Sequence, residues 1–138
     1  THGMLNSQCP SASFLVLAPD GGREGRLAVG DIAGLPLGGV RLVTLSACQT
    51  ALGDRDPGSE VTTMADAFSF AGSPSLMATL WKVADESTCA LMLDFYSNLK
   101  QGQSLSRSLQ GAQVKLLSRP DTAHPFYWAP FVLMGDWR

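Results

Sequence analysis

Cys48 is the residue of this sequence best placed to do chemistry, because it directly follows a short apolar run. The run from Val40 to Leu45 is rich in β-branched residues and predicts a buried strand over residues 40–46. Cys48 then lies at the carboxyl end of that strand, the edge of an open α/β sheet at which ligands bind. A cysteine is a nucleophile only as the thiolate, which needs a nearby base or positive potential.

A histidine is the usual base for a thiol, and the sequence contains two, His2 and His124. His124 precedes Pro125 within an aromatic cluster, where a neutral, hydrogen-bonded structural role is expected. His2 precedes Gly3, whose conformational freedom permits a tight turn and leaves a backbone N–H free to point into a site. These features favour His2 as the partner of Cys48, while the spacing alone also fits a cysteine that is simply packed in the core.

Other chemistries fit the sequence less well. The three cysteines are odd in number and form no CxxC pair, so neither a disulfide framework nor a zinc site is expected. Cys9 and Cys89 are therefore predicted to be small core residues. Ser46 and Thr50 offer hydroxyls, but no GxSxG motif surrounds them. No metal or organic cofactor is implied.

Length and composition predict one globular domain over residues 1–138, with 45% hydrophobic and 16% charged residues. The formal net charge of -2 and the lack of a Lys/Arg block argue against nucleic acid as a partner. No apolar stretch approaches the roughly 20 residues that span a bilayer, and the first residues, THGML, lack the basic and then apolar pattern of a signal peptide. No membrane contact is expected, and a cytoplasmic location is the default.

The elements that must position Cys48 follow from the apolar pattern. A hairpin is expected over 14–17 and 26–29, then a helical turn over 32–35 capped by Asp31. A helix capped by Thr62 or Thr63 and ending at Gly72 is expected, with Met64, Ala67, Phe68 and Ala71 at helical spacing. It leads into a strand over 75–81, which implies a parallel crossover from the strand at 40–46. The final strand is expected over 131–134.

Two further helices are expected between the last two strands. Asp85 is predicted to be the N-cap of a helix through Lys100, and Ser104 that of a helix ending near Ser118. The expected core-facing residues are, in the first helix, Cys89, Met92, Leu93, Tyr96 and Leu99, and in the second, Leu105, Leu109, Ala112 and Leu116. The aromatic residues 81, 126–128, 131 and 137 are expected to pack in the core and over the sheet.

Along nearly its whole length the sequence resembles the CHAT domain, a family of caspase-like and separase-like cysteine peptidases common in bacteria. The matching segments, in the family's order, are THG at 1–3, LSACQTALG at 45–53, the region of Ser59 and Glu60, FAGSPSLMATLWKVADEST at 70–88, DFYSNLKQGQSLSRSLQGAQ at 94–113 and HPFYWAPFVLMGD at 124–136. The resemblance implies a three-layer α/β caspase-like fold with a mostly parallel central sheet.

The resemblance also implies roles for residues. The histidine and the cysteine each follow a strand of the sheet, so His2 is the general base and acid and Cys48 the nucleophile. The backbone N–H groups of Gly3 and Cys48 form the oxyanion hole. Asp85 lies where separases receive a basic P1 side chain, but the metacaspase-type aspartate two residues before the cysteine is replaced by Ser46.

Family members have further strands before the HG pair, which predicts that this chain is the carboxyl-terminal part of a longer protein. The expected function is a cysteine endopeptidase that cleaves protein or peptide substrates, as the effector module of a larger bacterial signalling or defence protein. The expected partners are the substrate and the upstream part of the same protein, including possible sensor repeats. A non-catalytic interaction module, an inactive fragment and another thiol enzyme, such as an acyltransferase, remain alternatives.

Overall fold

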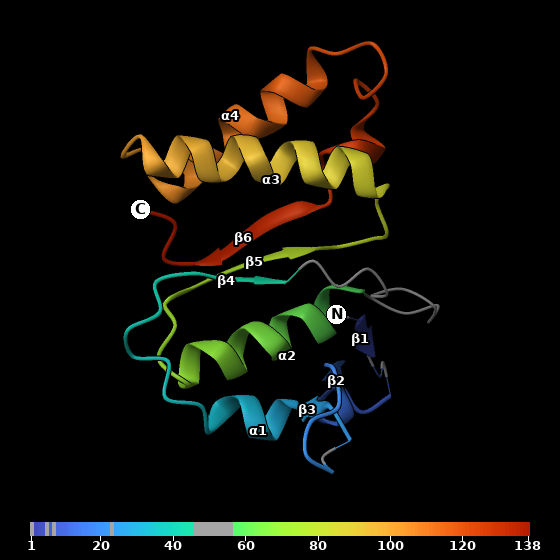
Figure 1. The fold of residues 1–138 in the computed structure, drawn as a ribbon, viewed down its shortest axis with the longest axis vertical. Coiled ribbons are helices and arrows are strands. Elements are labelled where there is room, and N and C mark those ends of the chain that lie inside the picture. The colour runs from blue at the N-terminus through green and yellow to red at the C-terminus, as the bar shows by residue number, and fades with distance from the viewer. Residues whose placement is uncertain (1, 5, 7, 23, 46–56) are drawn as a thin grey trace.

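Two three-stranded sheets and four α-helices make up the described part of the chain (Figure 1). The computed structural model describes residues 2–4, 6, 8–22, 24–45 and 57–138, with the backbone only for residues 2, 10 and 57–63. Short 3-10 helices, η1 (Pro10–Ala12) and η2 (Pro125–Tyr127), precede β2 and β6. The protein is therefore of the mixed α/β class that the sequence predicts.

The central sheet has the strand order β4-β5-β6, formed by β4 (Val43–Leu45), β5 (Ser75–Thr79) and β6 (Phe131–Gly135). β4 and β5 run parallel, with Leu45 opposite Ala78, which confirms the parallel pairing expected from the crossover. β5 and β6 run antiparallel, with Leu76 opposite Met134. The sheet is thus mixed among the described strands, where a mostly parallel one was expected.

A second, antiparallel sheet holds the start of the chain, in the order β1-β2-β3. It contains β1 (His2–Met4), β2 (Phe14–Val16) and β3 (Arg26–Ala28), and the hairpin expected from the turn residues is confirmed. His2 and Gly3 lie within β1, whereas the resemblance implied that they follow a strand of the central sheet. The difference arises because β1 pairs with β2 and forms no described pairing with β4.

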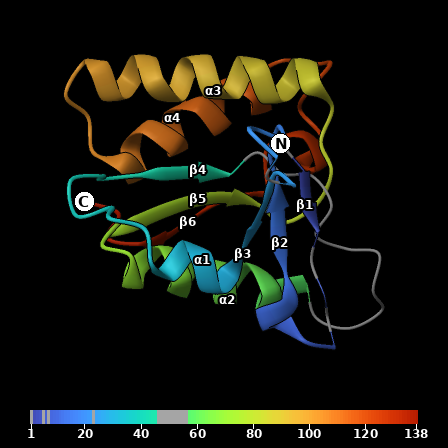
Figure 2. The ribbon, with the colours of Figure 1, turned by 60° about the horizontal axis from the view of Figure 1, so that its bottom comes forward.

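Helices cover both faces of the central sheet (Figures 1 and 2). α1 (Val29–Ala33) and α2 (Pro57–Phe70) lie on one side, and α3 (Asp85–Lys100) and α4 (Leu105–Leu117) lie on the other. None of the described helices is long and apolar enough to cross a membrane. The helices thus bury both faces of β5, all five of whose residues are buried.

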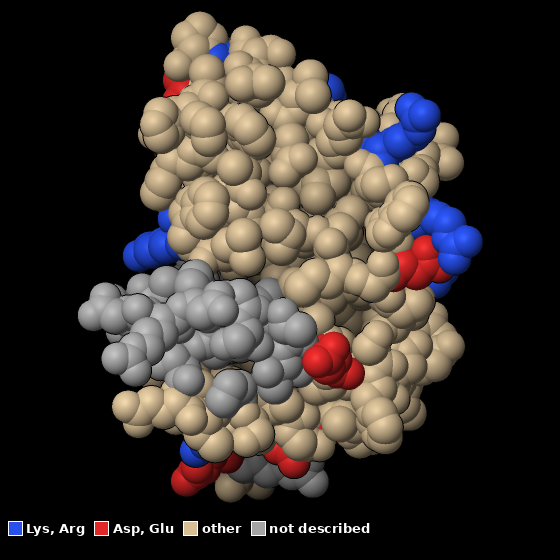
Figure 3. Space-filling model, turned by 180° about the vertical axis from the view of Figure 1, so that it is seen from behind, with Lys and Arg blue, Asp and Glu red and all other residues tan. Residues whose placement is uncertain are grey.

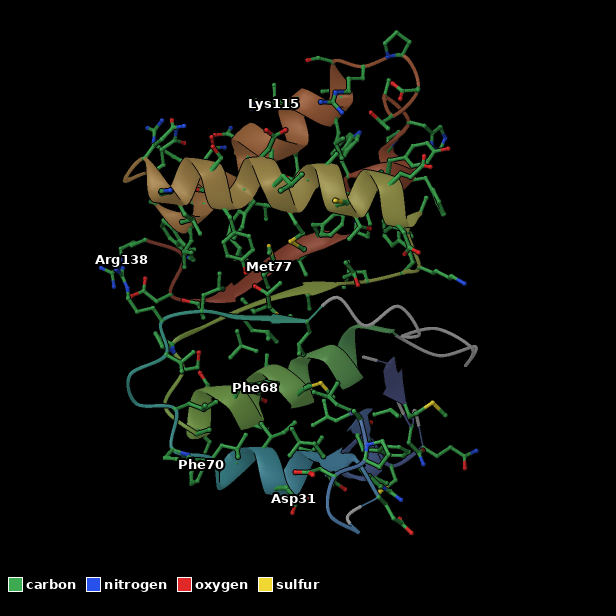
Figure 4. The ribbon with its side chains drawn as sticks, in the orientation of Figure 1. Asp31, Phe68, Phe70, Met77, Lys115 and Arg138 are labelled. Carbon is green, nitrogen blue, oxygen red and sulfur yellow. The ribbon has the colours of Figure 1, made fainter. Side chains whose placement is uncertain are left out.

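Successive residues of β5 point into two different hydrophobic clusters, as strand geometry requires (Figure 4). Leu76 and Ala78 pack with α1 and α2, where Phe68 is also buried. Met77 packs with α3, α4 and Phe131 and is fully buried. β5 therefore contributes side chains to both hydrophobic clusters.

Two of the predicted helix faces are confirmed. The residues expected to face inward from the first of these helices are buried: Met64, Ala67 and Phe68 in α2, and Ala71 directly after it. Those expected to face inward from α4 are also buried: Leu105, Leu109, Ala112 and Leu116. α2 begins at Pro57 rather than at Thr62 or Thr63, because proline is well tolerated in the first turn of a helix. Ser104 is the N-cap of α4, and its hydroxyl accepts a 3.4 Å hydrogen bond from the N–H of Arg107.

The predicted face of α3 is confirmed only in part, because Met92 and Leu99 pack against the core whereas Cys89, Leu93 and Tyr96 are exposed. Its buried residues are Ser87, Leu91 and Phe95, which follow one another at a spacing of four and meet the sheet and α4. The exposed fraction is 68% for Leu93 and 48% for Tyr96. Cys89 lies on the same outer side, and both Cys89 and Cys9 are exposed rather than in the core.

Two smaller corrections concern α1 and the aromatic residues. Asp31 is the third residue of α1 rather than its cap, and its carboxylate accepts a 3.2 Å hydrogen bond from the N–H of Ala28, the N-cap. Phe131 is buried as expected, but Phe126 and Trp137 are 45% and 58% exposed rather than in the core. Exposed aromatic rings at these positions are available for contact.

Candidate functional site

The carboxyl ends of β4 and β5 form one edge of the central sheet. Because the two strands are parallel and Leu45 lies opposite Ala78, both strands end at the same edge of the sheet. In Figures 1 and 2 both arrows point toward the side of the molecule on which β1 and the N-terminal end of α2 lie. The edge that the sequence predicted to carry the chemistry therefore lies near the strand that contains His2.

The predicted catalytic residues are only partly covered by the structure. His2 is the first residue of β1, opposite Val16. Gly3 is buried and lies opposite Leu15. Cys48 lies outside the described residues, as do Ser46 and Thr50. The pairing of His2 with Cys48 and the oxyanion hole at Gly3 and Cys48 therefore stay predictions.

Asp85 is the first residue of α3, and the N-cap position is held by Ala84 instead. The predicted N-cap role is therefore wrong, because the chain enters the helix one residue earlier. The hydroxyl of Ser87 donates a 2.9 Å hydrogen bond to the carbonyl oxygen of Ala84. Asp85 is exposed, and in the first turn its negative charge interacts favourably with the helix dipole. Its role toward a basic substrate side chain stays a prediction.

Directly after β5 the chain forms an open hollow of about 590 Å³ lined by Trp81, Lys82, Val83, Ala84 and Phe126, which we call the 81–84 hollow. Its lining is almost entirely apolar. The indole N–H of Trp81 donates a 3.1 Å hydrogen bond to the carbonyl oxygen of Phe126, joining the loop after β5 to η2. Asp85 follows this lining in sequence but does not belong to it.

Sequence reasoning missed the 81–84 hollow by treating Trp81 and Phe126 as core residues. The signal that could have found it is a tryptophan placed directly after a fully buried strand, at the sheet edge already singled out. η2 contributes Phe126 to the lining of the hollow. The Nδ1 atom of His124 accepts a 3.2 Å hydrogen bond from the N–H of Phe126. The structural role predicted for His124 is thereby confirmed.

The last residue of β5 carries a hydroxyl at the same edge. Thr79 is 2% exposed, and its Oγ1 atom has no hydrogen-bond partner among the residues that the structure describes. A buried hydroxyl without a partner costs about 1–3 kcal/mol. By contrast, Thr44 of β4 shares a 2.8 Å hydrogen bond with the hydroxyl of Tyr96 on α3.

Charge is sparse around the site. Lys82 is the one charged residue among the five that line the 81–84 hollow. Figure 3 shows the back of the molecule as mostly uncharged, with basic and acidic side chains near its margin and an acidic patch closer to the middle. Within the described ranges, no group of three His, Cys, Asp or Glu side chains could hold a metal ion.

The described groups with a shifted pKa lie far from this edge. The Arg138 side chain donates a 3.1 Å hydrogen bond to the carboxylate of Asp136, which lowers the pKa of Asp136 and raises the pKa of Arg138. Arg138 lies on the side of the molecule opposite β1 (Figure 4). These shifts therefore do not tune the candidate site.

These features define an α/β domain with helices on both faces of its sheet and an apolar hollow at the carboxyl edge. Residues 1–136 match the family model of the CHAT domain, and the chain belongs to this family. It is similar to the human Tetratricopeptide repeat protein 28, with 30% identity over 136 residues. The match covers 99% of this chain and 5% of that protein, so the chain spans a small part of its relative.

Proposed function

We propose that this CHAT domain is a cysteine endopeptidase in which His2 and Cys48 form the catalytic dyad. The family belongs to a caspase-like cysteine peptidase clan, which supports the class of reaction. The observation that carries the proposal is the position of β1, with His2 and Gly3, on the side of the molecule toward which β4 and β5 end. In the sequence, Cys48 comes three positions after Leu45, the last residue of β4.

The proposed reaction uses the chain's own groups only. His2 takes the thiol proton, and the Cys48 thiolate attacks the scissile carbonyl carbon to form a tetrahedral oxyanion. The N–H groups of Gly3 and Cys48 donate to that oxyanion, and the His2 imidazolium protonates the leaving amine. Water, deprotonated by His2, then releases the acyl group and restores the thiol. The mechanism needs no metal or organic cofactor.

We further propose that the domain acts as one module of a larger protein, whose upstream part and protein substrate are its partners. The small share of the human relative that the chain matches supports this organisation. Possible sensor repeats upstream, a bacterial origin, a signalling or defence role and a cytoplasmic location are carried over from the family resemblance and the composition.

A non-catalytic interaction module is the second candidate. The name of the human relative refers to tetratricopeptide repeats and to no enzymatic activity, which supports this alternative. A domain of this kind would keep the fold and the hollow but would not need a reactive thiol at position 48.

Labelling with a peptidyl chloromethyl ketone at neutral pH, followed by mass spectrometry, tests the proposal. Cys9 and Cys89 are exposed and serve as internal controls for ordinary thiol reactivity. We expect Cys48 to react at least tenfold faster than these two, and His2→Ala to abolish the difference. Equal labelling of all three thiols in the intact longer protein would favour the interaction module.

Product analysis separates the peptidase from an acyltransferase. A peptide substrate incubated with an added primary amine should yield the free carboxylic acid if water is the acceptor. Amide formation with the added amine as the main product would identify the acyltransferase instead.

A further inference from the structure

The 81–84 hollow has the size and position of a substrate subsite. It begins two residues after the end of β5, at the edge that β4 shares. Its volume of about 590 Å³ lies within the range of roughly 300–1,000 Å³ that small-molecule sites occupy. A peptide bound at this edge would therefore have one of its side chains next to Trp81 and Phe126.

The lining indicates an apolar occupant. The wall consists of side-chain and backbone carbon around Trp81, Val83 and Ala84, and the ring of Phe126 is 45% exposed to solvent. A leucine or phenylalanine side chain that covered these surfaces would remove apolar area from water on both partners, which favours binding. The only polar edge of the indole is already occupied by the carbonyl oxygen of Phe126.

The charges argue against a basic occupant. Lys82 is exposed and is the one charged residue of the lining, so a lysine or arginine in the hollow would meet a like charge. Asp85 is not part of the lining, and Glu86 lines a separate hollow together with Arg119. An acidic side chain next to the apolar one would instead reach the ammonium group of Lys82.

The walls are held in place without a ligand. Trp81 is tied to η2 through Phe126, and Phe126 is tied to His124 by its backbone N–H. The N–H of Leu80 donates a 3.0 Å hydrogen bond to the carbonyl oxygen of Pro130, just before β6. Because these groups are fixed in advance, binding costs little ordering of the protein.

We propose that the 81–84 hollow binds a large apolar side chain of the protein substrate, with an adjacent acidic side chain paired to Lys82. The inference rests on the proposed function for the identity of the occupant as a substrate. The family resemblance instead suggests that Asp85 receives a basic side chain of the substrate. The first assignment predicts a preference for Leu and Phe peptides, and the second predicts a preference for Arg and Lys peptides.

Binding to the Cys48→Ala variant tests the hollow without catalysis. The probes are N-acetylated pentapeptide amides, Ala-Asp-Xaa-Ala-Ala, in which Xaa is Leu, Phe, Arg or Asp. We expect the Leu and Phe peptides to shift the indole N–H signal of Trp81 in NMR spectra and to bind at least tenfold more tightly than the Arg and Asp peptides. Trp137, exposed and outside the lining, is the internal reference.

Substitutions in the lining test whether the peptides bind in the hollow. Phe126→Ala should weaken binding of the Phe peptide about tenfold, while Trp137→Ala, the matched control at another exposed aromatic residue, should leave it unchanged. Lys82→Glu should remove the advantage of the Asp-containing probe over its Ala-Lys-Xaa-Ala-Ala counterpart. Phe126→Leu keeps an apolar wall and should retain most of the affinity for the Phe peptide. Retained binding in this variant would show that substitution at position 126 does not by itself unfold the protein.

The outcomes separate the two proposals. Binding of apolar peptides to the hollow, without any cleavage by the wild-type protein, would overturn the proposed peptidase and keep the apolar preference of the hollow, but the occupant would then belong to a binding partner and not to a substrate. Cleavage that needs His2 and Cys48, but with a preference for Arg that Phe126→Ala leaves unchanged, would overturn this inference and keep the peptidase. Self-association of the chain that Phe126→Ala abolishes would make the hollow an interface between copies and would also overturn the inference.

Discussion

The indole N–H of Trp81 and the carbonyl oxygen of Phe126 are joined by a 3.1 Å hydrogen bond between two loops that are far apart in the sequence. One loop connects β5 to α3, and the other connects α4 to β6. The bond therefore fixes the relative position of the two walls of the 81–84 hollow.

Replacing Trp81 by phenylalanine should lower the free energy of unfolding by about 1 kcal/mol, because the hydrogen bond is lost while most of the ring is kept. Urea denaturation followed by circular dichroism measures the change. Trp137→Phe, at a 58% exposed position outside the hollow, is the control and should lie within about 0.5 kcal/mol of wild type. Equal effects of the two substitutions would show that the Trp81 bond contributes no stability.

Thr79→Val should raise the free energy of unfolding by about 1 kcal/mol, because it removes a buried hydroxyl that has no described partner and keeps the shape of the side chain. The matched control is Thr44→Val, which removes a hydroxyl bonded to Tyr96 and should lower stability by a similar amount. If Thr79→Val is also destabilising, the Thr79 hydroxyl has a hydrogen-bond partner in the folded protein, and the premise of this prediction is wrong.

Gly111 in α4 lies against Asn98 of α3, where an added Cβ would stand 2.9 Å from the Asn98 Nδ2 atom. That amide donates a 3.1 Å hydrogen bond to the carbonyl oxygen of Ser108. Gly111→Ala gains about 1 kcal/mol of helix propensity but displaces the amide, so we expect almost no net change in stability.

A double-mutant cycle isolates this contact. In an Asn98→Ala background the displaced amide is absent, and Gly111→Ala should then stabilise the protein by about 1 kcal/mol. The cycle is measured by thermal and urea unfolding of the four proteins. Equal effects of Gly111→Ala in both backgrounds would mean that Asn98 does not restrict this glycine.

The pKa of Asp136 should lie below the ordinary value of an aspartate side chain, because its carboxylate accepts a hydrogen bond from the Arg138 side chain. A carboxyl group whose pKa is lowered by folding stabilises the folded state above its unfolded pKa, and this contribution is lost as the pH falls through the folded pKa. Carbon-detected NMR titration measures the midpoint, which should rise in Arg138→Ala. An unchanged midpoint in that variant would show that the pair does not persist in solution.

Much of the fold could be predicted because local pattern and tertiary packing agree. In α4 the apolar residues Leu105, Leu109, Ala112 and Leu116 recur at helical spacing, and this pattern predicted the buried face even though Val114 and Leu117 are exposed. The central strands β5 and β6 were recognisable as short apolar runs bounded by turn residues. Family resemblance, carried by segments spread over the whole chain, predicted the CHAT domain.

The rest depended on contacts that the pattern does not contain. α3 has apolar residues all round, so both the stripe of Leu91 and Phe95 and that of Leu93 and Tyr96 fitted a helix, and packing against α4 chose the first. Asp85 and Ala84 are neighbours, and only the backbone conformation decides which of them is the cap. The hollow formed because a loop after β5 meets a loop before β6, a juxtaposition that no local sequence rule predicts.

The placement of β5 between a parallel and an antiparallel neighbour has a consequence for how the protein folds. Leu76 lies opposite Met134, so the β5-β6 ladder cannot close until the whole α3-α4 hairpin has brought the end of the chain back to the sheet. The α3-α4 contact is local in sequence and can form early, whereas the sheet depends on pairings between distant residues. Sequence separation of this kind slows folding, so the step that completes the central sheet should set the folding rate of the domain.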